Sequence, residues 1–369
     1  MERQFSVQTL KTWAQASSLL VKTSSIPILE HILIDRGSVV LGSQDSTLEW
    51  RMEDADTVSE WNPVAIPARD LERIVKVFPE EGVVSIREDG TVRFGKSRFH
   101  LPILPGKQYP VQGWQLPESW MTCQKADFDR FAPSLRRFAG VKDARIFLNG
   151  IHWALSGGKL RMESTNGHCA VRVEIPLHGN LDLGQESAPL DAILPTDALA
   201  SWGKLLQTQN VDQFSFGMKN GLFWLQAGSL RLRLSPIDSR YPDLGHALPK
   251  ADGRPLVLRC GIDELQTALS VAEIALESDR TLLLDLQPEE LCITGRSQEK
   301  MAESRLGASW SGPALRKAYD NKYLRSMVDS FREWEPEETE IELRMGQDDM
   351  DSCVVITPYG EMVVMPIRV

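Results

Sequence analysis

The stretch Pro-Ala-Arg-Asp-Leu-Glu-Arg-Ile-Val-Lys-Val-Phe, residues 67–78, is the segment from which the fold can be worked out. Its apolar residues fall at positions 71, 74, 75 and 78, the spacing of a helix with one apolar face. Two later segments repeat this phase, one with Leu199, Trp202 and Leu206 after Pro195, the other with Leu324, Met327, Val328 and Phe331. The leading leucines, at 71, 199 and 324, are 128 and 125 residues apart, which indicates an internal repeat of roughly 125 residues.

Each of these segments is followed by alternating, strand-like sequence. In the first two copies the strands flank Asp89-Gly90 and Asn220-Gly221, dipeptides that favour tight hairpin turns because both residues accept positive φ. Each copy is also expected to open with a helix, at about 7–20, 125–139 and 262–276. The pattern predicts an α+β fold of three tandem domains, each with two helices packed on antiparallel sheet, at 1–117, 118–249 and 250–369.

Composition narrows the function classes. A hydrophobic fraction of 42% and a charged fraction of 25% are typical of a globular protein, and no apolar run approaches a membrane span. The five cysteines are scattered and the N-terminus lacks a signal-peptide core, so we expect buried thiols in a cytoplasmic protein. We expect no metal, no cofactor and no catalytic residues. The net charge of −10 permits nucleic-acid contact only where basic residues share one surface.

One motif suggests a different function. Residues 90–97, Gly-Thr-Val-Arg-Phe-Gly-Lys-Ser, satisfy the phosphate-loop pattern G-x-x-x-x-G-K-[ST]. A phosphate loop needs a helix that opens at Lys96-Ser97, whereas the following residues alternate and contain Pro102. We therefore interpret the segment as a hairpin, and keep a nucleotide-hydrolysing enzyme built around Lys96 as the less favoured alternative.

Several strings resemble the bacterial β sliding clamp, the β subunit of DNA polymerase III. They run in order along the whole chain: Ile26-Pro-Ile-Leu29, Pro67-Ala-Arg69, Arg145-Ile-Phe-Leu-Asn-Gly150, Thr165-Asn-Gly-His168, Asp238-Ser-Arg-Tyr-Pro-Asp243 and Val363-Val-Met-Pro-Ile-Arg368. The resemblance implies a non-catalytic ring subunit that forms a head-to-tail homodimer around double-stranded DNA. It also implies that DNA polymerase subunits and the clamp loader bind it through short peptide motifs.

The resemblance nominates a cleft for those peptides. Its residues would supply apolar walls and a few polar anchors: Arg145, Leu148, Thr165, Gly167, His168, Cys169, Ala170, Pro242, His246, Ala247, Val363, Met365, Pro366 and Arg368. From the residues alone, His168 is best interpreted as a structural residue of the turn at 165–168, because no nucleophile with an orienting carboxylate is identifiable around it.

Two further surfaces are expected. Arg69, Arg73 and Lys76 lie on the helix face opposite the apolar one, and Arg130 and Arg137 lie across from a stripe of phenylalanines. We expect a DNA-facing set of Lys22, Arg69, Arg73, Lys76, Arg130, Arg137 and Lys142, although a solvated charged face is the simpler reading of any single helix. The resemblance places Phe99 and Leu101 against Ile274 and Leu276 in the dimer interface.

A scaffold that keeps the fold and the peptide cleft without closing on DNA remains the second alternative. Glu273, beside Ile274, and the scarcity of cations in the third copy's helices favour it.

Overall fold

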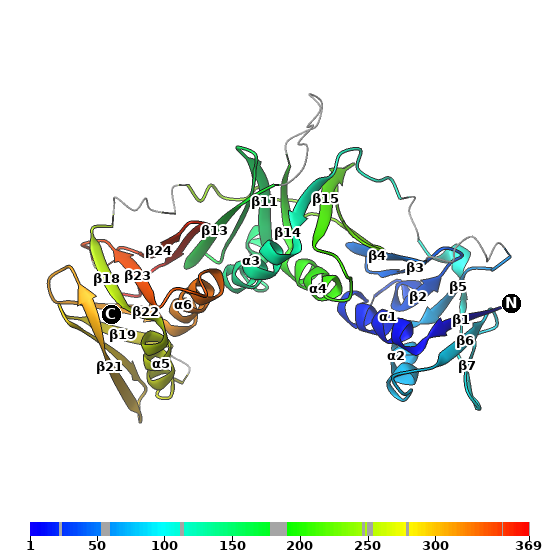
Figure 1. The fold of residues 1–369 in the computed structure, drawn as a ribbon, viewed down its shortest axis with the longest axis horizontal. Coiled ribbons are helices and arrows are strands. Elements are labelled where there is room, and N and C mark those ends of the chain that lie inside the picture. Colours follow the sequence, from blue (N-terminus) through cyan, green and yellow to red (C-terminus); the bar gives the residue numbers. More distant parts are fainter. Residues whose placement is uncertain are drawn as a thin grey trace. The chain divides into compact units, whose positions relative to one another are not determined.

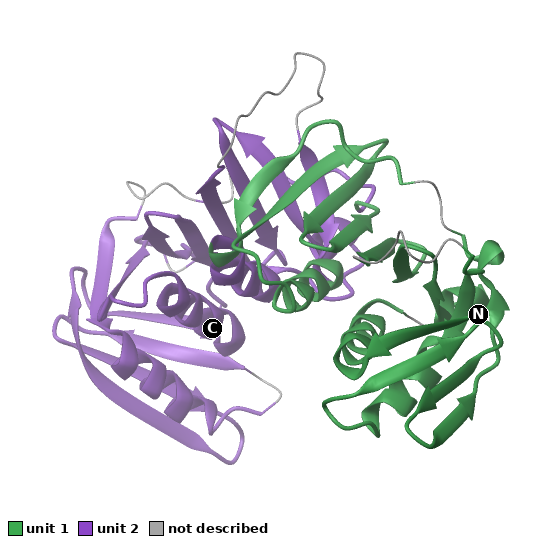
Figure 2. Ribbon diagram, turned by 45° about the vertical axis from the view of Figure 1, so that its right-hand side comes forward, with its two compact units in different colours: residues 1–126, 178–187, 197–236 green, residues 127–177, 188–196, 237–369 purple. Residues whose placement is uncertain are grey.

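The computed structural model describes residues 1–21, 24–52, 60–110, 114–177, 190–245, 248, 254–277, 280–348 and 350–368. The chain divides into two compact units (Figure 2). The described part of unit 1 lies within residues 1–126 and 197–236, and that of unit 2 within 127–177, 190–196 and 237–368.

The elements repeat three times in the same order: a strand, a helix, four strands, a second helix and then three strands (Figure 1). The first copy also has a short fourth closing strand. Its elements are β1 (Glu2–Ser6), α1 (Val7–Leu20), β2 (His31–Ile34), β3 (Ser38–Gly42), β4 (Ser46–Arg51), β5 (Val64–Pro67), α2 (Ala68–Lys76), β6 (Val83–Arg87), β7 (Thr91–Phe94), β8 (Ser97–His100) and β9 (Leu104–Pro105).

The second and third copies follow the same plan. The second comprises β10 (Met121–Gln124), α3 (Lys125–Phe138), β11 (Gly150–Ser156), β12 (Lys159–Thr165), β13 (Cys169–Pro176), β14 (Asp191–Pro195), α4 (Thr196–Leu206), β15 (Gln213–Lys219), β16 (Leu222–Ala227) and β17 (Leu230–Leu234). The third comprises β18 (Leu256–Gly261), α5 (Ile262–Glu273), β19 (Thr281–Leu286), β20 (Glu290–Arg296), β21 (Met301–Trp310), β22 (Leu315–Asp320), α6 (Asn321–Trp334), β23 (Glu340–Met345), β24 (Cys353–Thr357) and β25 (Gly360–Val364). The expected α+β class with antiparallel sheets is confirmed.

Strand pairing crosses the copies within each unit. Unit 1 holds a four-stranded sheet, β1-β6-β7-β8, and a nine-stranded sheet, β10-β15-β16-β17-β4-β3-β2-β5-β9. Unit 2 holds a twelve-stranded sheet, β14-β11-β12-β13-β25-β24-β23-β18-β21-β20-β19-β22. The second copy therefore contributes strands to both units, through β17 against β4 in unit 1 and β13 against β25 in unit 2.

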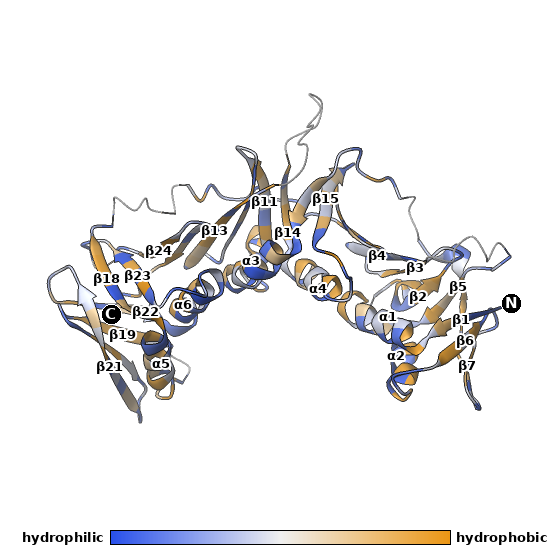
Figure 3. Ribbon diagram, viewed as in Figure 1, coloured by the Kyte–Doolittle hydropathy of each residue, from blue (hydrophilic) through white to orange (hydrophobic). Residues whose placement is uncertain are grey.

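The helices form as their sequence periodicity predicts. On α2 the buried residues include Leu71, Ile74 and Val75, while on α6 they include Leu324 and Phe331. Every labelled helix in Figure 3 carries both hydrophilic and hydrophobic positions, as expected of helices with one face on a sheet. Side-chain caps begin two of them: Ser6 accepts from the Thr9 amide and Asp320 from the Lys322 amide.

One helix is shorter than predicted. We expected a helix over 262–276, but α5 ends at Glu273. The last amides bond three residues back, Ile274 to Val271 and Leu276 to Glu273, so the chain tightens into a turn there. Ile274 and Leu276 consequently follow the helix and do not lie on it.

The hairpin interpretation of residues 90–97 is confirmed. Thr91–Phe94 and Ser97–His100 are the antiparallel strands β7 and β8, and the turn between them contains Gly95 at φ 55°. A strand follows Lys96 where a phosphate loop requires a helix, so the main-chain amides are not gathered at a helix N-terminus. The Asn220-Gly221 turn is also confirmed, with φ of 52° and 73°.

The five cysteines are buried and free, as expected. None of the helices in the described ranges is long and apolar enough to cross a membrane. Within the same ranges, no group of three or more His, Cys, Asp or Glu side chains is placed to hold a metal ion.

Candidate peptide-binding site

The nominated cleft residues that the structure describes all lie in unit 2, where the second and third copies share a sheet. Thr165 pairs with Ala170 across β12 and β13, and Ala170 pairs with Val363 across β13 and β25. The three side chains therefore share one face in a row across three strands. Ala170 and Val363 belong to an apolar cluster with Tyr241, Leu244 and Leu248, which together form an apolar floor.

The turn at 165–169 is held by its own side chains. Asn166 Oδ1 accepts from the amides of His168, at 2.9 Å, and Cys169, at 3.0 Å. Thr165 Oγ1 donates to the Cys169 carbonyl at 2.7 Å. Gly167 has φ 89°, and a Cβ there would lie 3.1 Å from Arg145 Nη1, so glycine suits both the backbone and the close approach. Hydrogen bonds from its own side chains hold the turn, and the Arg145 guanidinium lies against Gly167 and Asn166.

Arg145 is fixed at the rim of the site. Its guanidinium pairs with Asp143 at 3.0 Å and donates to the Asn166 carbonyl at 3.3 Å. The hydrogen bonds from Arg145 lower the pKa of the Asp143 carboxyl to about 2. Arg145 is exposed, so it remains available to peptide carbonyl or carboxylate groups while Asp143 orients it.

The C-terminal segment closes the other side. The Met365 amide donates to the His168 carbonyl at 2.9 Å, and the Ile367 amide donates to the Ala318 carbonyl at 2.8 Å. Met365 is 40% exposed. The His168 ring stacks on Tyr323, with centroids 6.0 Å apart and planes 8° from parallel. Tyr323 was missed by sequence reasoning, because nothing in its local pattern on α6 distinguishes it from other helix residues.

The nominated residues fall into two groups. Leu148, Cys169, Ala170, Val363 and Pro366 are buried and form floor, whereas Arg145, Gly167, His168, Met365 and Arg368 are exposed and form rim. Thr165 is buried and Pro242 half-buried, while His246 and Ala247 lie outside the described residues. Burial raises the pKa of the Cys169 thiol to about 12, so it is not a nucleophile at neutral pH. An apolar floor with a cationic and aromatic rim suits an extended peptide.

The cations of α2 point away from the sheet as predicted. Arg69, Arg73 and Lys76 are all exposed, the last two at 81% and 71% of the side chain. Each of those two has an acidic neighbour: Asp70 lies 3.6 Å from Arg73, and Glu72 lies 2.7 Å from Lys76. Lys142 is also exposed, and Lys22 lies outside the described residues.

Arg130 and Arg137 are not open cations of this kind. Arg137 bonds Glu333 of α6, at 3.0 Å through Nη1, and Ser330 at 3.1 Å. Arg130 lies over the Tyr359 ring, 5.2 Å from its centroid. Both are half-buried because side chains from other parts of unit 2 cover α3, which the sequence pattern of α3 does not reveal.

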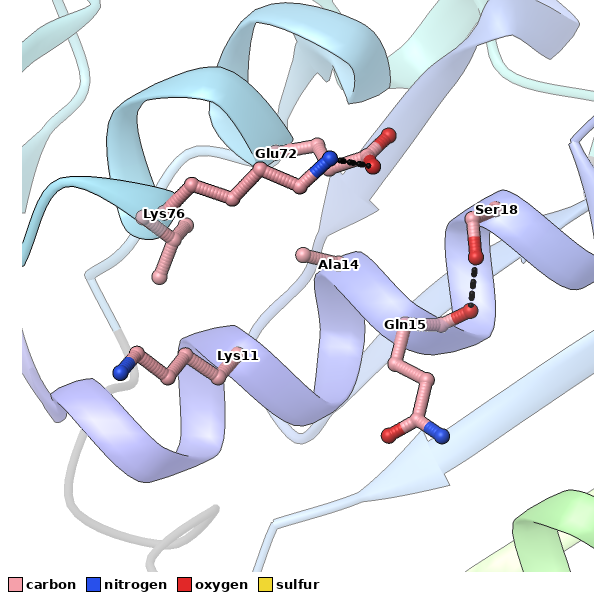
Figure 4. Close-up of a pocket in the computed structure, with 7 residues that line it drawn as sticks. Lys11, Ala14, Gln15, Ser18, Glu72 and Lys76 are labelled. Atoms are coloured by element: carbon pink, nitrogen blue, oxygen red, sulfur yellow. Dashed lines mark hydrogen bonds and ion pairs between the residues drawn. The ribbon is translucent and has the colours of Figure 1, made fainter. Parts of the chain in front are cut away.

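A pocket of about 380 Å³ lies between α1 and α2 in unit 1 (Figure 4). Ala14 and Val75 supply apolar lining, while Lys11 and Lys76 stand at its edges. Lys76 is bonded to Glu72, and Lys11 to Glu80 at 2.7 Å. Both lysines at the pocket therefore have a carboxylate partner.

The four nominated dimer residues differ in exposure. Ile274 is 74% exposed and Leu276 half-buried. Phe99 lies on β8, the edge strand of its sheet, and is half-buried with its ring centroid 6.1 Å from that of Phe78. Leu101 is only 7% exposed, because its amide bonds the Gly90 carbonyl and draws the chain inward after β8. Leu101 therefore has little surface left to bury against another subunit.

Comparison with known proteins identifies the chain's relatives. Residues 4–113 match the family described as DNA polymerase III beta subunit, N-terminal domain. The beta sliding clamp of Proteus mirabilis is 27% identical over 98% of each chain, and that of Caulobacter vibrioides is 24% identical over 98% of this chain and 97% of that one.

Solved structures show the same fold. The DNA polymerase sliding clamp from Bacillus subtilis matches with a TM-score of 0.88 and 19% identity, covering 100% of this chain and 99% of that chain. The DNA polymerase III subunit beta from Pseudomonas aeruginosa matches with a TM-score of 0.86 and 21% identity over 100% of both chains. The resemblance of the sequence strings is thereby confirmed along the whole chain: residues 4–113 match the DNA polymerase III beta subunit family, and the full length is similar to bacterial beta sliding clamps in sequence and in fold.

Proposed function

We propose that this chain is the subunit of a DNA sliding clamp, a processivity factor that encircles duplex DNA and tethers polymerases to it. The observation that carries the proposal is the threefold repeat of one α+β plan along a chain that matches beta sliding clamps from end to end. A closed ring holds DNA by topology, so a subunit with net charge −10 needs only local cations. The clamp is non-catalytic, and we propose that it serves a DNA polymerase holoenzyme in the cytoplasm.

The ring follows from a head-to-tail homodimer of three-domain subunits, with domains at 1–117, 118–249 and 250–369. Phe99 on one subunit would meet Ile274 on its partner, and two such contacts close a ring. Light scattering should give a mass near twice 41.4 kDa. The Ile274→Asp variant should be monomeric, because it places an unpaired charge in an apolar contact. A dimer unaffected by this change would remove the interface assignment.

The DNA-facing cations of the proposal are Arg69, Arg73 and Lys76 on α2, with Lys142 and Lys22. These would contact phosphates without reading sequence. Arg130 and Arg137 stay in the proposed set as half-buried members whose charges are partly engaged by Tyr359 and Glu333. The expected signature is retention on circular DNA after loading and rapid loss when the circle is cut. Equal retention on linear DNA would refute encirclement.

The peptide site is the surface built on Ala170 and Val363 with the rim of Arg145, His168 and Met365. Partners are proposed to be polymerase and clamp-loader segments that carry Gln-Leu followed by an aliphatic or aromatic pair. Burying two large side chains would supply about 3–6 kcal/mol before ordering costs. A labelled Gln-Leu-Ser-Leu-Phe peptide should therefore bind and be measurable by fluorescence anisotropy.

A matched pair of variants tests the location of the site. Met365 and Met350 are 40% and 42% exposed, both in unit 2, and only the former belongs to the proposed surface. Met365→Asp should weaken peptide binding at least about tenfold by placing a charge in an apolar contact. Met350→Asp should leave it unchanged. Equal effects of the two substitutions would disprove the assignment.

The contact made by Glu273 weakens one of the two features that favour the scaffold alternative. Glu273, next to the exposed Ile274, pairs with Arg325 at 2.8 Å, so its charge is partly neutralised within its own chain. A scaffold would bind the peptide but remain a monomer and show no difference between circular and linear DNA. The mass and DNA experiments therefore separate it from the clamp.

A further inference from the structure

An ion-paired row crosses four strands of unit 2 beside the peptide surface. His152 pairs with Glu163 across β11 and β12, Glu163 with Arg172 across β12 and β13, and Arg172 with Glu361 across β13 and β25. Glu163, Arg172 and Glu361 each lie two positions along their strands from Thr165, Ala170 and Val363, so both rows share one face of the sheet. His152 shares this face because it pairs directly with Glu163. The charged row and the apolar floor are neighbours.

His152 is held from two sides. Its Nδ1 lies 3.1 Å from Glu163 Oε2 and its Nε2 lies 3.0 Å from Asp191 Oδ1. Glu163 is in turn bonded by Arg172 Nε at 2.6 Å, and Arg172 also bonds Glu361 at 3.2 Å. Both imidazole nitrogens can donate at once only when the ring is protonated. The protonated ring therefore satisfies both carboxylates.

The same ring supports Tyr241. The two rings stack with centroids 4.7 Å apart and planes 15° from parallel. Tyr241 is 8% exposed and belongs to the apolar floor with Ala170 and Val363. Its hydroxyl is buried beside the main chain of Thr165, without a hydrogen bond of normal geometry among the described residues. The floor of the peptide surface thus rests on a ring that His152 orients.

We propose that Tyr241 is a positioning residue of the peptide surface, and that His152, clamped between Glu163 and Asp191, fixes the orientation of its ring. The inference rests on the proposed peptide-binding function and adds a specificity element to it. When His152 is neutral, one nitrogen becomes an acceptor facing a carboxylate oxygen, so one of the two contacts is lost. The ring is then less constrained, and Tyr241 is held less firmly under the peptide.

The direction of the pH dependence follows from the groups that face His152. These are Glu163, Asp191 and Tyr241, with Arg172 and Glu361 one step farther along the row. Burial alone lowers the pKa of His152, but the hydrogen bonds to Glu163 and Asp191 outweigh it and the net pKa is raised. Peptide affinity should therefore be higher on the acidic side and fall as pH rises through the pKa of His152.

The test is a peptide titration of the full chain at about pH 5.5 and about pH 8.5, which bracket histidine titration. An uncharged, N-acetylated and C-amidated Gln-Leu-Ser-Leu-Phe peptide avoids titration of the ligand. Wild type should bind about threefold to tenfold more weakly at the higher pH, the range of one buried hydrogen bond. His152→Gln should abolish most of this difference. His168 and His246 are present in both proteins, so the comparison isolates His152.

Two further variants separate positioning from general loss of structure. Glu174→Gln removes the 2.9 Å ion pair between Arg161 on β12 and Glu174 on β13, and this variant should keep the wild-type pH profile. Tyr241→Phe keeps the stacked ring and should also keep the profile, whereas Tyr241→Ala should lose both affinity and pH dependence. Circular dichroism confirms that each variant is folded.

The outcomes are distinct. Equal pH profiles for wild type and His152→Gln, or an unchanged profile in Tyr241→Ala, would overturn the proposal for Tyr241. If wild type binds no peptide at both pH values, the proposed peptide-binding function itself is refuted.

Discussion

The contact between α3 and α6 supports a quantitative prediction about the stability of unit 2. Trp334 is fully buried, its indole N–H donates to Ser134 Oγ at 2.9 Å, and its ring meets Phe131 edge-on at 5.3 Å. Ser134 is also fully buried. The serine hydroxyl is therefore the acceptor that allows an indole N–H to be buried at this contact.

Ser134→Ala should destabilise the protein by about 2 kcal/mol, because it leaves the indole donor buried without an acceptor. Trp334→Ala should cost about 3–5 kcal/mol through loss of the ring and the cavity it leaves. In the Trp334→Phe background no indole donor is left to be stranded, and Arg137, which also donates to Ser134 Oγ at 3.4 Å, keeps its bonds to Glu333 and Ser330. There, Ser134→Ala should cost about 1 kcal/mol less than in wild type.

Urea unfolding followed by far-UV circular dichroism measures these changes as midpoint shifts at constant slope. Ser326→Ala is the matched control, since Ser326 is 7% exposed on α6 and its hydroxyl bonds only the Lys322 carbonyl of its own helix in the described structure. It should change stability by no more than about 0.5 kcal/mol. If Ser134→Ala is as mild as this control, the hydrogen bond does not stabilise the contact as argued.

Three further predictions concern other parts of unit 2. Lys317 is 3% exposed and donates to the main-chain carbonyls of Asp348 and Asp351, so Lys317→Met should lower the unfolding free energy by about 2–4 kcal/mol. The control Arg316→Met, on the exposed face, should change the unfolding free energy by less than about 1 kcal/mol. Similar melting temperatures for the two variants would contradict this prediction. A Cβ on Gly360 would lie 2.0 Å from the Arg172 carbonyl oxygen, so Gly360→Ala should push β25 from β13 and destabilise the protein by about 3 kcal/mol. A melting temperature equal to that of wild type would show that the strands accommodate the added methyl group. Arg145 lowers the pKa of Asp143 to about 2, below its unfolded value of about 3.9. The stabilisation is therefore present above about pH 4 and lost as pH falls toward 2, so the melting temperatures of wild type and Asp143→Asn should converge across that range; a constant difference would refute the ion pair's role.

Local chemistry in the sequence was enough to predict the repeated helices, the hairpins at Asp89-Gly90 and Asn220-Gly221, and the strand that excludes a phosphate loop. These features depend on neighbours three or four residues apart or on turn residues that accept positive φ. The string from Thr165 to His168 is of the same kind, because its turn is built from its own side chains. The clamp family could be recognised for that reason, since several such local strings occur in order.

The tertiary structure decided which distant segments meet. The sequence pattern of α3 shows Arg137 opposite an apolar stripe, but only the folded chain brings Glu333 to it, 196 residues away. The hydrogen bonds that hold His152 between Glu163 and Asp191 depend on the pairing of β11 with β12 and β14. Leu101 is buried because its amide bonds the Gly90 carbonyl across a hairpin. Periodicity identifies the buried face of an element, whereas the partner of that face is set by sheet order and register, which depend on strand edges from distant parts of the chain.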